Sequence, residues 1–231
     1  MTPERYETIC RVLNQRQPDL TVITDEVHKG RNLSAIIRTC DAVGINRFHC
    51  VEPKKGYRAF RGTALGSHKW VETVLHQDVT KGLKELKSNN FQIVAANLSE
   101  SAVDFREIDY TKPTALLMGT EKQGVSADAL ALADHQVVIP MMGMVESFNV
   151  SVACAIILTE AQAQRQKAGL YSRCRIPKEE YDRTLFQWCQ PVVTKYCDEN
   201  GLDYPPLDAE GEIIEPAEWY RKIRQQKQQV E

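Results

Sequence analysis

This chain lacks the long hydrophobic run that a membrane anchor or a secretory signal requires. Its 231 residues are 42% hydrophobic, and the first twenty, MTPERYETICRVLNQRQPDL, carry charges throughout without a continuous apolar stretch. A transmembrane helix needs roughly 20 apolar residues in succession, and a secretory signal needs about 7–15. We therefore expect a cytoplasmic protein with no membrane partner, whose length suits one main globular domain with short extensions.

Paired cysteines are also missing. The chain has seven cysteines, which is an odd number, and no CxxC pair. This pattern argues against a disulfide framework and against a zinc site, since both need cysteines in matched sets. We expect reduced thiols, mostly in the core, and no metal cofactor.

Common nucleotide-binding and hydrolase motifs are absent as well. MGTEKQGV, which begins at Met118, has two glycines that resemble those of a phosphate loop, but Val125 follows the second glycine in place of Lys and Ser or Thr. There is no GxGxxG after an early strand, no GxSxG and no HExxH. Five scattered histidines remain, and we assign none of them a catalytic role.

The chain has no excess of either charge, with 29 Lys and Arg against 31 Asp and Glu. Binding to nucleic acid would therefore depend on local basic clusters. Two segments are basic and free of acids: KKGYRAFRGTALGSHK (54–69) and AQAQRQKAGLYSRCRIPK (161–178). Both also contain aromatic residues, which stack on unpaired bases while the cations neutralise phosphates. A solvated surface explains either segment alone, but two such segments favour RNA.

The middle of the chain alternates β-rich runs with helix-like stretches. The runs begin at Leu20, Arg47, Trp70, Phe91, Thr114 and His135. Strands that alternate with helices predict an α/β fold with a largely parallel sheet.

Three helices are expected within this alternating region. One follows Asn32 as a plausible N-cap and ends before Gly44, with Arg38 opposite its apolar stripe. The others span 78–89 and 148–167. The two flanks of the chain lack strand alternation and contain helical stretches, so we expect helical extensions that pack against the core or a dimer mate.

Three segments resemble, in order and spacing, the three motifs of the SpoU branch of the SPOUT RNA methyltransferases. They are NLSAIIRTCDAVG (32–44), LLMGTEKQGV (116–125) and IPMMGMVESFNVSVACAIIL (139–158). The similarity extends over nearly the whole chain. It implies a SPOUT-type α/β fold, in which a mostly parallel sheet is flanked by helices and its C-terminal part is threaded into a deep trefoil knot.

The resemblance also implies a domain organisation and an activity. Residues 1–19 would form an N-terminal helical extension, 20–168 the methyltransferase domain with its knot at about 115–165, and 169–231 a helical extension that binds tRNA. The family member would work as a homodimer and transfer a methyl group from S-adenosylmethionine to the ribose 2′-hydroxyl of guanosine 18 in the tRNA D-loop. Two alternatives stay open: a ribosomal-RNA ribose methyltransferase of the same superfamily, or a non-catalytic RNA-binding protein with this fold.

Two residues of the first motif are the catalytic candidates. Asn32 and Arg38 match the positions that the family places beside the target ribose across the dimer interface. By chemistry alone, Asn32 is a helix cap and Arg38 a solvent cation. A guanidinium group can bind a phosphate and stabilise an alkoxide that forms on the 2′ oxygen. Because guanidinium does not normally deprotonate in proteins, we favour this electrostatic role over that of a general base.

The donor-site candidates come from the second and third motifs and from the end of the FQIVAANL run, since α/β folds bind ligands at strand ends. By the resemblance they would hold S-adenosylmethionine with loop backbone and apolar walls. They are Ala96, Asn97, Gly119, Glu121, Ile139, Met141, Ser147, Phe148 and Asn149.

The RNA-binding candidates are cations of the first helix and of the two basic segments. Glu4, Glu7 and Asp19 offset the charge of the first helix, so RNA contact there is the weaker expectation. The candidates are Arg5, Arg11, Arg16, Lys54, Lys55, Arg58, Arg61, Arg165, Lys167, Arg173 and Arg175.

Overall fold

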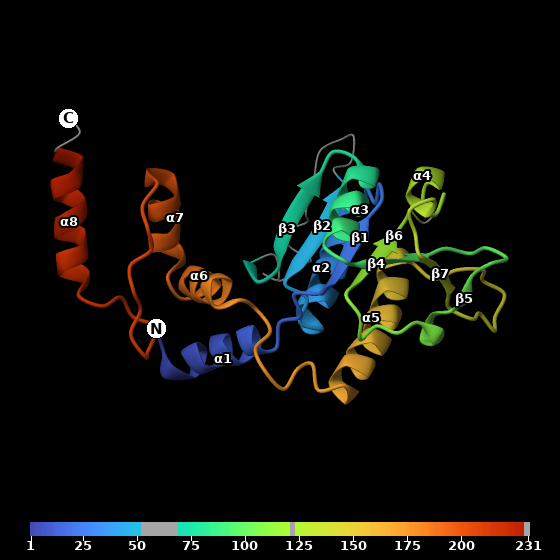
Figure 1. Ribbon diagram of the computed structural model, residues 1–231, viewed down its shortest axis with the longest axis horizontal. Helices are drawn as coiled ribbons and strands as arrows, with labels where there is room; N and C mark the ends of the chain where they lie inside the picture. Colours follow the sequence, from blue (N-terminus) through green and yellow to red (C-terminus); the bar gives the residue numbers. More distant parts are fainter. Residues whose placement is uncertain (52–68, 121–122, 229–231) are drawn as a thin grey trace. The chain divides into compact units, whose positions relative to one another are not determined.

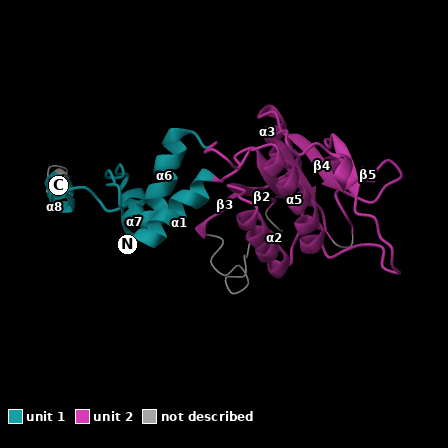
Figure 2. Ribbon diagram, turned by 90° about the horizontal axis from the view of Figure 1, so that it is seen from below, with its two compact units in different colours: residues 1–14, 176–231 teal, residues 15–175 magenta. Residues whose placement is uncertain are grey.

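The computed structural model describes residues 1–51, 69–120 and 123–228 (Figure 1). The chain divides into two compact units, which Figure 2 colours separately. One unit is the continuous segment Gln15–Arg175, and the other combines Met1–Asn14 with Ile176–Glu231.

The larger unit contains a seven-stranded parallel sheet (Figure 1). Its strand order is β3-β2-β1-β6-β4-β7-β5, so β1, β6 and β4 lie at its centre. Each of the six predicted β-rich runs contains one strand, which confirms the α/β prediction. The two-residue strand β5 was not predicted, because two residues carry no alternation. The strands are β1 (Leu20–Thr24), β2 (Arg47–Val51), β3 (Glu72–His76), β4 (Gln92–Ala96), β5 (Val103–Asp104), β6 (Thr114–Met118) and β7 (His135–Val138).

Helices cover both faces of this sheet. Apolar residues of α2 (Gly30–Ala42) and α5 (Val150–Lys167) form one buried cluster with the strands. The opposite cluster includes residues of α3 (Val79–Ser88) and α4 (Ala127–Leu130). A short 3-10 helix, η2 (Phe105–Glu107), follows β5. Strand β6, strand β7 and helix α5 lie in the segment where the resemblance implies a trefoil knot, and the knot stays a prediction.

The ends of the helices correct one detail of the sequence analysis. Helix α2 begins at Gly30 with Lys29 as its N-cap, so the prediction that Asn32 caps this helix was wrong. The backbone N–H of Asn32 already donates to the Lys29 carbonyl at 2.9 Å, which places Asn32 in the first turn. Asn149 instead caps α5 by accepting from the Ser151 N–H at 2.9 Å.

The smaller unit is helical throughout its regular structure. It contains α1 (Pro3–Asn14), α6 (Lys178–Cys189), α7 (Pro191–Asn200) and α8 (Pro216–Gln228). Helix α1 packs against α6, and α6 packs against α7. The expected helical stretches at both flanks are confirmed. None of the helices in the described part of the chain has the length and apolar character needed to span a bilayer.

Candidate active site

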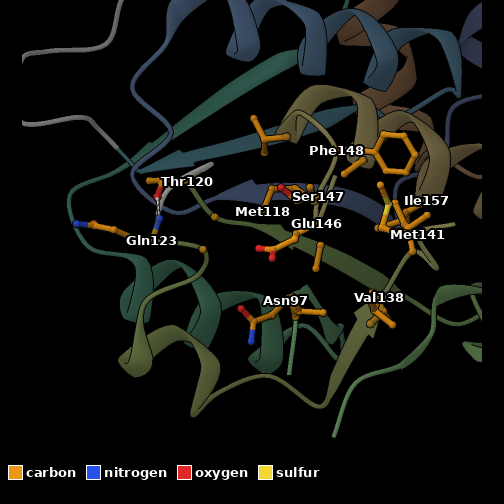
Figure 3. A pocket seen from close by; sticks show the side chains of 18 residues that line it. Asn97, Met118, Thr120, Gln123, Val138, Met141, Glu146, Ser147, Phe148 and Ile157 are labelled. Carbon is orange, nitrogen blue, oxygen red and sulfur yellow. Dashed lines mark hydrogen bonds between the residues drawn. The ribbon is translucent and has the colours of Figure 1, made fainter. Parts of the chain in front are cut away.

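Three neighbouring strands end at one cavity of about 410 Å³ (Figure 3). The last residue of each strand lines the cavity, and so does the residue that follows it: Asn97 after β4, Gly119 after β6 and Ile139 after β7. Because the strands are parallel, their carboxyl ends meet at the same edge of the sheet, where α/β folds bind ligands. The second and third motifs, which are separated in sequence, therefore face each other across this cavity.

Most of the predicted donor-site residues line the cavity. Asn149 does not line it, and Glu121 lies outside the described residues. The lining candidates are Ala96, Asn97, Gly119, Ile139, Met141, Ser147 and Phe148.

The sequence analysis missed part of the lining. Figure 3 shows Glu146, directly before the predicted Ser147, among the side chains of this cavity. Val150, Ala153 and Ile157 of α5 also line it. Their spacing of three and four residues is the helical period, so the face of α5 that meets the cavity was open to prediction.

The turn after β6 can be made only with glycine. A Cβ atom on Gly119 would lie 2.1 Å from the backbone of Gly124, a distance at which backbone atoms collide. Thr120 and Gly124 exchange two backbone hydrogen bonds, of 2.8 and 3.0 Å, and Gly124 has a φ of +67°. Gly119 and Gly124 both line the cavity, so they present main-chain atoms to it.

The other walls combine polar and apolar groups. Asn97 is fixed by its backbone N–H, which donates to the Val137 carbonyl at 3.1 Å, and by its amide, which donates to Gln136 Oε1 at 3.0 Å. Ile139 packs against the core, whereas Phe148 is 39% exposed. A cavity that combines apolar walls with fixed polar groups suits a flat heterocycle that has polar atoms on its edge.

A second hollow, of about 340 Å³, adjoins the first. Thr120, Gln123 and Val150 line both cavities. Its remaining lining comes from the loop before α2 and from Asn32. The amide of Asn149 donates to Asn32 Oδ1 at 3.3 Å, so residues 117 positions apart in the first and third motifs meet here.

The two catalytic candidates have different surroundings. Asn32 is 9% exposed and faces the second hollow. Arg38 is exposed, as its place opposite the apolar stripe predicted, and it lines neither of these two cavities of the single chain.

Arg16, a predicted RNA contact, is buried in the larger unit. Its guanidinium is fully buried and donates to Asp41 Oδ1 at 2.7 Å, to the Ile45 carbonyl at 2.9 Å and to the Trp70 carbonyl at 3.0 Å. These bonds compensate the cost of burying the charge. The sequence prediction is corrected here, because this group does not reach the surface.

Arg165 and Arg175, also predicted RNA contacts, share one carboxylate. Asp19 accepts from Arg165 at 2.7 Å and from Arg175 at 2.6 and 2.7 Å. Arg165 is fully buried and also donates to the Tyr110 carbonyl at 2.9 Å. Burial opposes ionisation of Asp19, but the bonds from Arg175 and Arg165 prevail and lower its pKa. Arg165 is therefore a structural residue, and Arg175 is held by the same acid.

The remaining RNA candidates divide by their position. Arg5, Arg11, Lys167 and Arg173 are exposed. Lys54, Lys55, Arg58 and Arg61 lie outside the described residues. Among the described residues, no group of three or more His, Cys, Asp or Glu side chains could hold a metal ion.

Comparison with known proteins supports the resemblance. Residues 19–159 match the model of the SpoU rRNA Methylase family, and residues 163–216 match that of the SpoU rRNA methylase C-terminal domain. The Escherichia coli K12 protein named tRNA (guanosine(18)-2'-O)-methyltransferase is 50% identical over 226 residues, which cover 97% of this chain and 99% of the relative.

Solved structures show the same relation. The crystal structure of the A. aeolicus TrmH/SpoU tRNA modifying enzyme matches with 43% identity and a TM-score of 0.75, over 87% of this chain and 98% of that one. The AdoMet-bound rRNA methyltransferase from Sinorhizobium meliloti matches with 29% identity and a TM-score of 0.59, over 68% of this chain and 59% of that one. This chain belongs to the SpoU methylase family.

Proposed function

We propose that this protein transfers a methyl group from S-adenosylmethionine to the ribose 2′-hydroxyl of guanosine 18 in the D-loop of tRNA. One observation carries the proposal: the chain aligns over 97% of its length with a tRNA (guanosine(18)-2'-O)-methyltransferase, and its second and third motifs line one cavity at the strand ends. The cavity has the volume of a small-molecule site, for which about 300–1,000 Å³ is typical.

The lining fits S-adenosylmethionine, the AdoMet that the S. meliloti rRNA methyltransferase binds in its crystal structure. The turn at Gly119 exposes backbone polar groups for the adenine edge, and Ile139, Met141 and Phe148 supply apolar walls. Ser147 and Asn97 offer polar contacts. When bound, the donor supplies a methyl group activated by a positive sulfonium. The protein needs no metal for this chemistry, because its own task is to position the ribose and activate its hydroxyl.

Asn32 and Arg38 are the residues we assign to the acceptor. Asn32 lines the hollow beside the donor cavity, and its Oδ1 accepts from the Asn149 amide at 3.3 Å, which supports a role for Asn32 next to the ribose. Arg38, which is exposed, is available to a nucleotide phosphate. Its guanidinium stays protonated and stabilises the negative charge that develops on the 2′ oxygen as its proton leaves for solvent.

Exposed apolar residues support a homodimer. Val145 is 63%, Phe148 39% and Val152 44% exposed, and the three occupy the third motif beside the donor cavity. Apolar surface of this kind marks protein contacts when it is contiguous. A second copy on this surface would bring its own residues to the site, which accounts for an Arg38 that lies apart from the cavities of its own chain.

The RNA partner is tRNA in this proposal, and the protein works in the cytoplasm. Arg5, Arg11, Lys167 and Arg173 are the described cations that remain available for phosphates. The family model carries the description rRNA methylase, which is the observation that favours ribosomal RNA as a second candidate substrate. The 50% identity to the E. coli tRNA enzyme outweighs it, against 29% to the S. meliloti rRNA enzyme.

The decisive experiment is methyl transfer from labelled S-adenosylmethionine to unmodified tRNA. A 2′-O-methylated ribose resists alkaline hydrolysis, so a protected linkage after guanosine 18 is the expected result. Transfer to ribosomal RNA alone would change the substrate, and donor binding without transfer to any RNA would indicate a non-catalytic RNA-binding protein. Absence of donor binding would refute the proposal.

A further inference from the structure

The helical unit contains a cavity that methyl transfer does not explain. Its volume is about 420 Å³, close to that of the donor cavity, and it lies wholly between elements of this unit. Aromatic and proline side chains, among them Tyr6, Phe186, Tyr204 and Pro205, line it. The rings of Phe186 and Tyr204 stack with centroids 4.6 Å apart and an interplanar angle of 16°. The cavity thus offers flat, rigid walls.

Charged groups of both signs surround these walls. Lys178 and Arg183 line the cavity, and so do Asp182 and Asp208. Lys178 is already paired with Asp182 at 2.6 Å. Arg183, which hydrogen-bonds to Tyr204, and Asp208 are the cation and the anion outside this pair.

Asp208 is held in a fixed orientation. Its Oδ1 atom accepts from the backbone N–H groups of Glu210 and Glu212, both at 2.9 Å. Hydrogen bonds from backbone N–H groups, first that of Glu212, lower the pKa of Asp208, so the side chain is an ionised acceptor near neutral pH. Both of these hydrogen bonds are accepted by Oδ1, so Oδ2 can accept from other donors.

We propose that this cavity binds one unpaired nucleoside of the RNA substrate. The base stacks on the aromatic walls, its N–H edge donates to Asp208 Oδ2, and Arg183 contacts the adjoining phosphate. This inference rests on the proposed function, since it takes the ligand to be part of the RNA that is methylated.

Three features favour a nucleoside over other ligands. Stacking of unpaired bases on aromatic side chains is a main source of affinity for single-stranded RNA. Guanine, adenine and cytosine each present N–H donors on an edge, which a carboxylate accepts. An apolar side chain of a protein partner would make use of neither the Asp208 carboxylate nor the Arg183 guanidinium at the cavity wall. One cavity therefore provides the three contacts that a single nucleotide needs.

Asp208→Asn tests the carboxylate in the full-length protein. The turn amides hold the Asn oxygen in the place of Oδ1, so the substitution turns the other atom from an acceptor into a donor. General electrostatics predicts tighter RNA binding, because a negative charge is lost. Our proposal predicts the opposite: a rise of about tenfold in the KM for unmodified tRNA. Asp203→Asn is the matched control, since this exposed acid of the same segment does not line the cavity, and its KM should not rise.

Ultraviolet cross-linking of the wild-type protein to unmodified tRNA gives a second measurement. Ultraviolet light joins an aromatic side chain directly to a base that stacks on it. Peptide mapping should therefore find an RNA adduct on Tyr6 or Tyr204. An adduct only on Trp219 or Tyr220, the aromatic pair of α8, would overturn the proposal. So would a KM for Asp208→Asn that is equal to or below that of the wild type.

Failure of this inference is separable from failure of the proposed function. If guanosine 18 is methylated and no adduct forms in the cavity, the proposed function holds and the nucleoside site is refuted. An adduct in the cavity without methyl transfer keeps the site and refutes the activity. In both cases the far-ultraviolet circular dichroism of Asp208→Asn, compared with that of the wild type, verifies that the helical unit of the variant is folded.

Discussion

The two ends of the parallel sheet use polar residues in opposite ways. At the amino end, Arg165 donates to the Asp19 side chain and, at 3.1 Å each, to the carbonyls of Asp19 and Lys112, which precede the adjacent strands β1 and β6. At the carboxyl end, the residues after β4, β6 and β7 surround a cavity. Polar groups at one end are bonded to the protein itself, whereas those at the other end face space that a ligand can fill.

This contrast separates residues of one chemical type. Arg165 and Arg173 belong to the same basic segment, yet one is fully buried and the other exposed. A buried guanidinium whose donors are used within the fold contributes stability and has nothing left for RNA. Burial and hydrogen bonding within the fold, more than residue type, therefore decide which cations of this RNA-modifying protein are available to RNA.

The largest expected effect is that of Arg165→Met on stability. Loss of one member of a buried ion pair costs about 3–5 kcal/mol, and Asp19 keeps Arg175 as a partner, so we expect the free energy of unfolding to fall by about 3 kcal/mol. Urea unfolding measures it. Arg173→Met, the exposed counterpart, should stay within about 0.5 kcal/mol of the wild type. Equal unfolding free energies for the two variants would contradict the structural role of Arg165 at the amino end of the sheet.

Arg38→Ala should act on the reaction and leave the fold unaffected. Loss of an electrostatic contact to a developing oxyanion lowers kcat about 10²–10³-fold, while the urea midpoint of an exposed site should hardly move. A pH–rate profile of Arg38→Lys tests whether the guanidinium group itself is required. Full activity of that variant would remove any specific role for the guanidinium fork.

Gly119→Ala tests the turn at the donor cavity. The added Cβ meets backbone 2.1 Å away, so the turn must open, and we expect the dissociation constant for S-adenosylmethionine to rise about tenfold. Isothermal titration calorimetry provides the measurement. Gly143→Ala is the matched control, because nothing lies within 4 Å of its Cβ position. Unchanged affinity in Gly119→Ala would show that the turn does not shape the donor site.

The smallest expected effect is the pH dependence contributed by Asp19. Its pKa is lowered in the folded protein, so the stability it adds is complete above the unfolded pKa of about 3.9 and is lost as the pH falls through the folded value. Unfolding free energies of the wild type should therefore fall more steeply below about pH 5 than those of Asp19→Asn. Parallel curves for the two proteins would show that this carboxylate is not coupled to folding.

Sequence patterns were sufficient for most of the fold. Strands such as β6 are buried apolar runs, and α2 carries its apolar residues at helical spacing, so local patterns located both. The order of the three motifs then indicated the family. The resemblance supplied most of the nine donor candidates, and seven of them line one cavity, because the strand ends of a parallel sheet share one edge.

The sequence by itself determined the strands, the main helices and the family, because each depends on local spacing or on motif order. Only the tertiary structure decided where Arg16, Arg165 and Asn32 place their polar groups. Arg165 bonds to Asp19, 146 positions away, and Asn32 accepts from Asn149, 117 positions away. The burial of a charged or amide side chain cannot be predicted from its own sequence segment, since burial depends on which distant elements pack over it.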